Sequence, residues 1–346
     1  MTSSFRRKRA TGRVTLADVA TLAGVSAMTV SRVLRGDGAV SAELAGRVKS
    51  AVETLGYLPD PAARALASRH GSHVAVLIPL LSNEVFVDLL EGAQQTLRAA
   101  GLQTLIGITH YDPLEEEQLL REQLLHRPAG VLITGTQHSA ATTALIARSG
   151  VPCIHLMEVA PPPAGQGAAK YCVGFSQQEA GAALTRHLLE RGRKRIAFAA
   201  AQLDPRTLQR MEGWRQCLQE QGLYDPVLEW KSPEPSSMEL GARMFQQIVG
   251  HAGPVDAIFF CNDDLAQGAL LAALKMGIAV PERVAVAGFN DLKGSAQMLP
   301  PLTTVRTPRA AVGIEAASML LQLMRGEAPR ESCRDLGFEL VVRAST

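Results

Sequence analysis

The stretch VTLADVATLAGVSAMTVSRVL, residues 14–34, predicts two short helices joined by a tight turn. Thr15 precedes Asp18 by three residues, the spacing at which two such side chains cap the first turn of a helix. Gly24 lies in the turn, where a residue free to adopt positive φ is needed. Ser26 caps the second helix. The apolar face of that helix consists of Val30, Val33 and Leu34.

The other face of the second helix points outward in this prediction and consists of Ala27, Met28, Thr29, Ser31 and Arg32. Outward residues at the start of the second helix of such a pair enter the major groove of DNA. Arg32 is expected to anchor or read base edges, with apolar contacts from Ala27 and Met28. The expected phosphate contacts are Ser26, Thr29 and Ser31, with Thr15 as a further candidate DNA contact. A helical hairpin with no role in DNA binding would have the same caps and the same apolar stripe.

This segment resembles the DNA-binding module of the lactose-repressor (LacI) family of bacterial regulators, and the resemblance continues along the chain. Residues 40–55 predict a third helix with one apolar face. Residues 56–68, GYLPDPAARALAS, are similar to the family's hinge segment, which becomes helical on operator DNA. The resemblance implies that Leu66 wedges into the minor groove, where unstacking a base step costs about a few kcal/mol. The alternative is an ordinary leucine on a helix face.

The charge is distributed unevenly along the 346 residues. Residues 1–68 contain ten Lys and Arg against five Asp and Glu, whereas the remainder contains 25 against 28. A basic module on a weakly acidic body fits binding of a polyanion by one end. Residues 1–13 include FRRKR but no following apolar run, so they are not a secretory signal. We expect a disordered basic arm that attracts phosphates, or else a plain solvated tail.

Several classes of protein are disfavoured by what the sequence lacks. No apolar run reaches about 18 residues, so no membrane span is predicted. The five cysteines are scattered and include no Cys-x-x-Cys, so we expect no disulfide framework, no metal, no cofactor and a reduced, cytoplasmic compartment. Most of them are expected to be small core residues. No nucleophile elbow, P-loop or His-x-x-x-His motif is present, and the protein is predicted not to be an enzyme.

From His73 onward, apolar strand-like runs alternate with helical stretches, and the pattern restarts near Ile196. We predict two doubly wound α/β lobes in succession with a cleft between them. Ligands of such sheets bind at the carboxyl ends of the strands. Polar loops follow six of the predicted strands, at residues 81–84, 134–138, 158, 202–207, 262–264 and 290–291. Their shared location favours a pocket for a polyhydroxylated ligand.

Residues 72–343 resemble the two-lobed, sugar-binding-protein-like core of the same family. The matching stretches are 261–266 (CNDDLA), 280–291 (VPERVAVAGFND) and 300–305 (PPLTTV). The resemblance implies that Arg210 clamps the effector, that Asn262 binds a hydroxyl group and that Phe86 lies under the ligand. Asn290 occupies a position usually held by Asp, which removes a charge from the pocket. Further candidates from the strand-end loops are Ser82, His138, Glu158 and Arg206.

The effector is predicted from Arg206 and Arg210, which lie one turn apart at the start of a helix. Such a pair suits a carboxylate or phosphate, although a solvated helix face would look the same. The loops at 134–138, 155–158 and 203–207 and the stretch 307–309 (TPR) resemble the gluconate-repressor branch of the family. A sugar acid of the gluconate type is therefore expected, with 2-ketogluconate and 6-phosphogluconate as alternatives.

The predicted organisation is a basic arm (1–13), an all-α helix-turn-helix domain (14–56), a hinge (57–71) and a two-lobed α/β effector and dimerisation domain (72–346). The predicted function is repression of transcription, released when the sugar acid binds between the lobes. A homodimer on double-stranded operator DNA is expected, because one helix-turn-helix reads only a half-site. The alternatives are a corepressor-dependent regulator, a sugar-binding protein without a regulatory role and a structural nucleoid-type binder.

Overall fold

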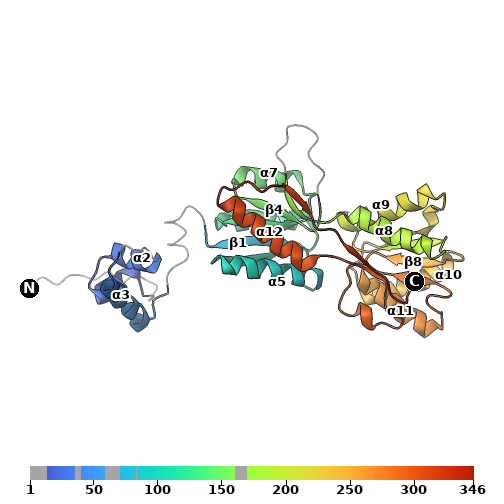
Figure 1. Ribbon diagram of the computed structural model, residues 1–346, viewed down its shortest axis with the longest axis horizontal. Coiled ribbons are helices and arrows are strands. Elements are labelled where there is room, and N and C mark those ends of the chain that lie inside the picture. Colours follow the sequence, from blue (N-terminus) through green and yellow to red (C-terminus); the bar gives the residue numbers. More distant parts are fainter. Residues whose placement is uncertain (1–13, 36–39, 59–70, 83, 160–169) are drawn as a thin grey trace, which may run out of the picture. The chain divides into compact units, whose positions relative to one another are not determined.

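The structure, a computed structural model, describes residues 14–35, 40–58, 71–82, 84–159 and 170–346 (Figure 1). The chain forms two compact units, which divide between Gly71 and Ser72. The predicted arm and Leu66 of the predicted hinge lie outside the described residues. Each unit is described separately below.

The N-terminal unit consists of three helices, α1 (Leu16–Ala23), α2 (Ala27–Arg35) and α3 (Ala42–Leu55). The predicted capping box is present, because the Thr15 amide donates to the Asp18 carboxylate at 2.9 Å and the Asp18 amide donates to the Thr15 hydroxyl at 3.4 Å. Gly24 ends α1 with a φ of +62°. Arg47 of α3 donates to the Ala23 carbonyl at 2.6 Å and so fastens the turn. The core is small and consists of Val19, Ala20, Ala23, Val30, Val48, Ala51 and Tyr57.

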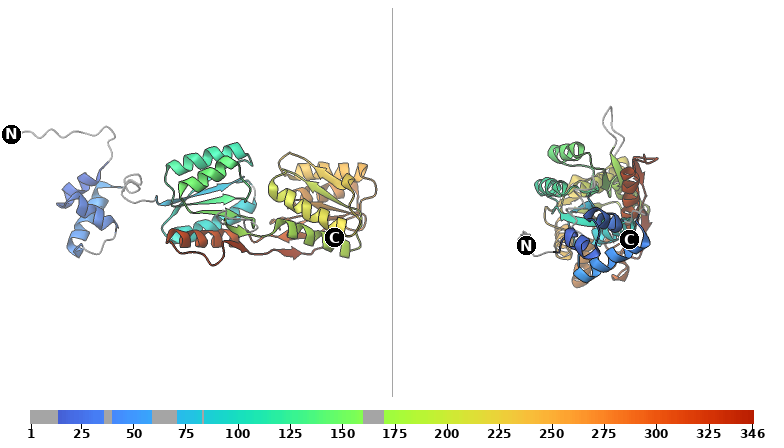
Figure 2. Two further views of the ribbon diagram at one scale, coloured as in Figure 1. Left: turned by 90° about the horizontal axis from the view of Figure 1, so that it is seen from above. Right: turned by 90° about the vertical axis from the view of Figure 1, so that its left-hand side faces the viewer.

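The first lobe of the second unit is a six-stranded parallel sheet with helices on both faces (Figures 1 and 2). The strand order is β11-β5-β4-β3-β1-β2. The strands are β1 (His73–Ile78), β2 (Gln103–Ile108), β3 (Gly130–Thr134), β4 (Cys153–Leu156), β5 (Tyr171–Gly174) and β11 (Cys333–Asp335). The helices are α5 (Glu84–Ala99), α6 (Pro113–Leu125), α7 (Ala140–Ser149) and α12 (Arg309–Met324). Apolar strands such as β1 are buried on both faces, as predicted.

The second lobe is a four-stranded parallel sheet with the order β7-β6-β8-β9. Its strands are β6 (Ile196–Ala200), β7 (Glu229–Lys231), β8 (Ala257–Phe260) and β9 (Ala285–Ala287). Its helices are α8 (Gln177–Glu190), α9 (Pro205–Glu220), α10 (Met238–His251) and α11 (Asp263–Met276), with short 3-10 turns at Pro226–Leu228 and Ser295–Gln297. Strands β10 (Thr304–Arg306) and β12 (Glu339–Val341) form a separate antiparallel pair.

The two lobes are interwoven, which corrects the expectation of two lobes in succession. The chain enters the second lobe after β5, returns to the first through β10 and α12, and leaves it again between β11 and β12. Helix α12 lies along α5, shown in red and teal in Figure 1. The close approach depends on glycine, because a Cβ at Gly313 would come within 2.1 Å of the Leu89 carbonyl oxygen. Sequence analysis did not predict α12, which returns to the first lobe more than 200 residues after α5.

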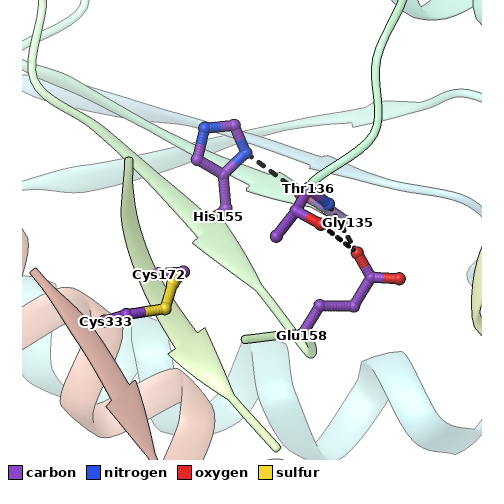
Figure 3. The surroundings of a disulfide bond; sticks show 6 residues. All are labelled: Gly135, Thr136, His155, Glu158, Cys172 and Cys333. Carbon is purple, nitrogen blue, oxygen red and sulfur yellow. Dashed lines mark hydrogen bonds between the residues drawn. A yellow bond between two sulfur atoms is a disulfide. The ribbon is translucent and has the colours of Figure 1, made fainter. Parts of the chain in front are cut away.

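The expectation of unpaired cysteines is wrong for one pair. Cys172 and Cys333 form a disulfide, with their Cα atoms 4.5 Å apart (Figure 3). The two residues are register neighbours on β5 and β11, the edge of the first-lobe sheet. The pairing was not predictable because Cys333 reaches this edge only through the return of the chain from the second lobe. The other cysteines, Cys153, Cys217 and Cys261, are buried as predicted.

No single helix of the described ranges is long and apolar enough to cross a membrane. Helix α1 and residues 27–34 pass that test only when combined across a bend of 102°. Within the same ranges, no three His, Cys, Asp or Glu side chains are grouped so as to hold a metal ion.

Two glycine substitutions in the second lobe should have opposite effects on stability. A Cβ at Gly213 of α9 would lie 2.0 Å from the Gln178 carbonyl oxygen of α8, so Gly213→Ala should lower the free energy of unfolding by about 1–3 kcal/mol. Gly250 of α10 has nothing within 4 Å of the added atom, so Gly250→Ala should raise it by about 0.5–1 kcal/mol. Urea denaturation of the two variants measures both; equal effects would contradict the close α8–α9 packing.

Candidate functional site

The exposed face of α2 is the candidate nucleic-acid surface of the N-terminal unit. Met28 is 71% exposed, and Ala27 and Arg32 are exposed beside it, whereas Val30 on the opposite face is fully buried. The Ser26 hydroxyl accepts from the Thr29 amide at 3.1 Å and lies 2.9 Å from the Thr29 hydroxyl. The Ser26 hydroxyl therefore caps α2, and the Thr29 hydroxyl contacts it. The remaining candidates differ in position, since Ser31 is half-buried and Thr15 caps α1.

Two cavities lie between the lobes of the second unit. The larger, of about 410 Å³, is lined from the first lobe by the loops after β2, β3 and β4 and from the second lobe by residues 202–206. The smaller, of about 240 Å³, lies between the loop after β1 and the residues that follow β8. Tyr111 and Gln202 line both cavities and so separate them. The predicted polar loops at the carboxyl ends of the strands contribute to these walls.

Glu158 is a buried carboxylate at the wall of the larger cavity (Figure 3). One of its oxygens accepts from the Thr136 amide at 2.6 Å and from the Thr136 hydroxyl at 2.8 Å. The other oxygen accepts from Gln209 of α9, in the second lobe, at 3.3 Å. Glu158 therefore contacts both lobes and still faces the cavity with a hydrogen-bond acceptor.

A pair of histidines supports the same wall. His138 Nδ1 lies 2.9 Å from a Glu116 carboxylate oxygen, and its Nε2 lies 3.0 Å from His155 Nδ1. The Gly135 carbonyl oxygen lies 3.0 Å from His155 Nδ1 (Figure 3) and 3.1 Å from His138 Nε2. Burial, reinforced by the neighbouring His138, lowers the pKa of His155 to about 4, so this ring is neutral at pH 7.

Arg210 is buried in the second lobe and contacts the candidate residue Asn262 directly. Its Nε donates to Gln177 at 2.7 Å, and its Nη1 donates to the Cys261 carbonyl at 2.7 Å and to Asn262 Oδ1 at 3.0 Å. The guanidinium carbon lies 4.0 Å from the centroid of the Phe289 ring. Burial lowers the pKa of Arg210. The guanidinium is thus held rigidly, with Nη2 unpaired among the described residues.

Asn290 completes a cluster with Arg210 and Asn262. Its Nδ2 donates to Asn262 Oδ1 at 3.0 Å, while its own Oδ1 is buried and has no partner among the described residues. The backbone of Asn290 has a φ of +107°, which is unusual for a residue with a Cβ atom. The cluster therefore offers an unused guanidinium nitrogen and an unused amide oxygen.

Arg206 faces the first lobe instead of lying free at the helix start. Its Nε donates to Asp204 at 3.0 Å, and its guanidinium carbon lies 5.6 Å from the ring centroid of Phe86 and 5.7 Å from that of Tyr111. Burial alone would raise the pKa of Asp204, but Arg206 and Arg210 hold it below its ordinary value. Burial raises the pKa of Tyr111 to about 12. Arg206 thus joins the lobes through cation–π contacts with both rings.

The adjacent aspartates at the start of α11 have different roles. Asp263 is fully buried and accepts hydrogen bonds from the Leu292 amide, the Ser295 hydroxyl and, at 2.6 Å, the Thr304 hydroxyl. Asp264 lines the smaller cavity and accepts from the Ser236 hydroxyl at 2.7 Å. Of the two, only Asp264 faces the space between the lobes.

The structure distributes the predicted effector residues over three positions. Ser82 and Asn262 line the smaller cavity, and His138, Glu158 and Arg206 line the larger one. Phe86, Arg210 and Asn290 lie behind these walls. Sequence analysis missed Tyr111 and Ser236 as wall residues. Tyr111 could have been identified, because its loop follows directly on strand β2.

Comparisons with known proteins agree with this architecture. Residues 15–60 match the family model of bacterial regulatory proteins, lacI family, and residues 185–346 match that of the periplasmic binding protein-like domain. The HTH-type transcriptional regulator GntR of Pseudomonas aeruginosa is 49% identical over 346 residues, which covers 100% of this chain and 99% of the relative.

Two solved structures are similar over most of their length. The transcription regulator GntR from Chromobacterium violaceum has a TM-score of 0.76 and 49% identity, covering 79% of this chain and 98% of that one. The lac repressor dimer bound to operator and the anti-inducer ONPF has a TM-score of 0.84 and 25% identity, covering 96% and 99%.

The low pKa of His155 generates a prediction about acid stability. Its folded-state pKa of about 4 lies below the ordinary value of 6.5, so the unfolded chain binds this proton first as the pH falls. The free energy of unfolding should therefore decrease between about pH 6.5 and pH 4, with a share from His155 of at most about 3 kcal/mol. His155→Gln should remove that share, whereas His251→Gln at an exposed histidine should not. Denaturation curves across this range measure the slope; an unchanged slope in His155→Gln would contradict the assignment.

Proposed function

The chain belongs to the LacI family of bacterial regulatory proteins, and from this premise we propose that it is a homodimeric repressor released from its operator by a sugar acid. DNA-binding regulation of transcription follows from the family. The sugar acid, the site between the lobes, the dimer and the direction of the response are the proposal.

The observation that carries the proposal is the cluster of Arg210, Asn262 and Asn290. It holds a rigid guanidinium behind Asn262, which lines the smaller cavity, and among the described residues Arg210 Nη2 and the buried Asn290 Oδ1 have no partner. A carboxylate is the natural acceptor for a guanidinium nitrogen. An amide oxygen takes a hydroxyl hydrogen, such as that of the neighbouring C2 hydroxyl of an aldonate.

The walls of the two cavities suit the rest of such a molecule. Glu158, Asp204 and Asp264 present carboxylate oxygens, and Gln202 presents an amide. Carboxylates accept hydrogen bonds from hydroxyl groups, whereas they repel another carboxylate. A gluconate-type ligand is therefore expected to place its acid end at Arg210 and its polyol chain along these groups. The candidates that share this chemistry are gluconate, 2-ketogluconate and 6-phosphogluconate.

Release from DNA requires that the effector bind the two lobe arrangements unequally. Groups from both lobes line each cavity, so a ligand that touches both favours one arrangement. We expect a coupling free energy of about 1–3 kcal/mol between the effector and the operator. Gel-shift titration on the DNA upstream of the chain's own gene, with and without gluconate, tests the whole proposal. Tighter binding with gluconate would indicate a corepressor-dependent regulator, and no operator binding at all would favour a sugar-binding protein.

The DNA surface is tested at Arg32. Arg32→Ala should lower the affinity for the specific operator by about 1–3 kcal/mol, because a bidentate contact to a base is lost. Gluconate affinity should stay unchanged, since Arg32 lies in the other unit. Lys49→Ala, at an exposed basic residue of α3, removes the same charge and is the control. Fluorescence anisotropy on specific and random DNA measures both; equal losses in the two variants would contradict a reading role for Arg32.

The effector clamp is tested at Arg210. Arg210→Ala should keep repression but respond to gluconate only at concentrations higher by about tenfold or more, because a charged hydrogen bond to the carboxylate is lost. Arg215→Ala, on the same helix but paired with Glu229, is the control. Thermal melting verifies that both variants are folded. A wild-type response of Arg210→Ala would show that the carboxylate binds elsewhere.

A further inference from the structure

Arg309 is the first residue of α12 and contacts both lobes at once. Its Nε and Nη2 donate to one carboxylate oxygen of Asp88, on α5 of the first lobe, at 3.0 Å and 2.9 Å. Its Nη1 donates to the backbone carbonyl oxygen of Asn290, in the second lobe. The Arg309 side chain is only 11% exposed and that of Asp88 27% exposed, so this network is shielded from water.

The Asn290 end of this network carries backbone strain. A φ of +107° is unfavourable for a residue with a Cβ atom and persists only where its surroundings hold it. The Asn290 amide donates to the Val305 carbonyl at 2.8 Å, and its side chain donates to Asn262. The Asn290 backbone also forms a parallel bridge with Arg306, and Arg309 adds a side-chain contact to the carbonyl oxygen. A residue at the start of first-lobe helix α12 is thus one of the groups that hold Asn290 in the conformation that directs its side chain toward Asn262.

The Asp88 end lies on a helix that begins at the effector site. Helix α5 starts at Glu84, directly after the loop that contributes Ser82 to the smaller cavity. It also carries Phe86, which contacts Arg206. The strand that precedes it in the chain, β1, begins at His73, two residues after Gly71, the last residue of the N-terminal unit. Helix α5 is therefore the first helix after the boundary with the N-terminal unit.

The chemistry of the link requires arginine. A planar guanidinium donates in fixed directions to acceptors on two sides, whereas the ammonium group of lysine is a single point with three mobile donors. Only the first geometry fixes the carbonyl of Asn290 relative to the Asp88 carboxylate.

We propose that Arg309 positions Asn290 for the effector and that the Asp88–Arg309–Asn290 link carries the effect of ligand binding from the second lobe to α5. This role rests on the proposed function above. The two halves of the link have separable consequences. The Arg309–Asn290 contact sets the affinity for the effector. The Arg309–Asp88 contact sets how strongly the bound effector lowers the affinity for the operator.

The test uses the full-length protein and two measurements, gluconate affinity by calorimetry and the ratio of operator Kd with and without saturating gluconate. Asp88→Asn removes the charge that anchors Arg309 to α5 and should lower that ratio by about fivefold while changing gluconate affinity much less. Arg309→Gln and Arg309→Lys should weaken gluconate binding by about tenfold and also lower the ratio. Glu315→Gln is the matched control, because it breaks an ion pair of the same helix α12 with Arg334 that does not reach Asn290.

A wild-type ratio in Asp88→Asn, or the same fall in Glu315→Gln, would overturn the proposal. A wild-type protein that does not respond to gluconate would instead refute the proposed function. In that case hydrogen exchange of residues 288–293 decides on the link without any ligand. Faster exchange in Arg309→Gln than in the wild type and in Glu315→Gln supports the positioning role, and equal rates in all three refute it.

Discussion

A single buried carboxylate, Asp263 at the start of α11, connects this helix to residues 292–295 and to strand β10, which lie beside the space between the lobes. Its oxygens accept from the Thr304 hydroxyl of β10 at 2.6 Å, from the Ser295 hydroxyl at 2.7 Å and from the Leu292 amide at 2.7 Å. Burial raises its pKa to about 6. A Cβ at Gly288 would lie 2.2 Å from this carboxylate, so only glycine fits at position 288, directly after β9. The start of α11, the loop that carries Asn290 and the return strand β10 are therefore fixed to one another.

The interwoven path of the chain determines how the lobes can move. Three segments cross between them, and the antiparallel β10–β12 pair ties two of these together. At the first-lobe sheet, the Cys172–Cys333 disulfide joins β5 and β11, the strands that precede the first and the third crossing. Such a connection permits rotation about the crossing segments but resists separation of the lobes. Contacts that span the cleft, such as Arg206 with Phe86 and Gln209 with Glu158, then select among a few lobe arrangements.

The sequence predicts best where the determining contacts are local. The Thr15–Asp18 cap, the turn at Gly24 and the polar strand ends follow from spacings of a few residues, and the structure contains them. Even the partner of Arg206 is only two residues away, at Asp204. The partners of Arg210 come from α8 and from the end of β8, and those of Arg309 from α5 and the loop after β9. No local pattern encodes these contacts, because they exist only once the chain has crossed between the lobes.

The balance of charge in the space between the lobes explains why an acid would be preferred to a neutral sugar. Arg210 has no carboxylate among its hydrogen-bond partners, and the carboxylate that stabilises its charge, Asp204, is hydrogen-bonded to Arg206 instead. The carboxylates Glu158, Asp204 and Asp264 lie along the cavities instead, with Arg206 paired to Asp204. A neutral sugar would satisfy the carboxylates but give Arg210 no carboxylate as a hydrogen-bond partner. In the proposed binding mode a sugar acid would satisfy both ends, with its carboxylate at Arg210 and its hydroxyl groups at the carboxylates.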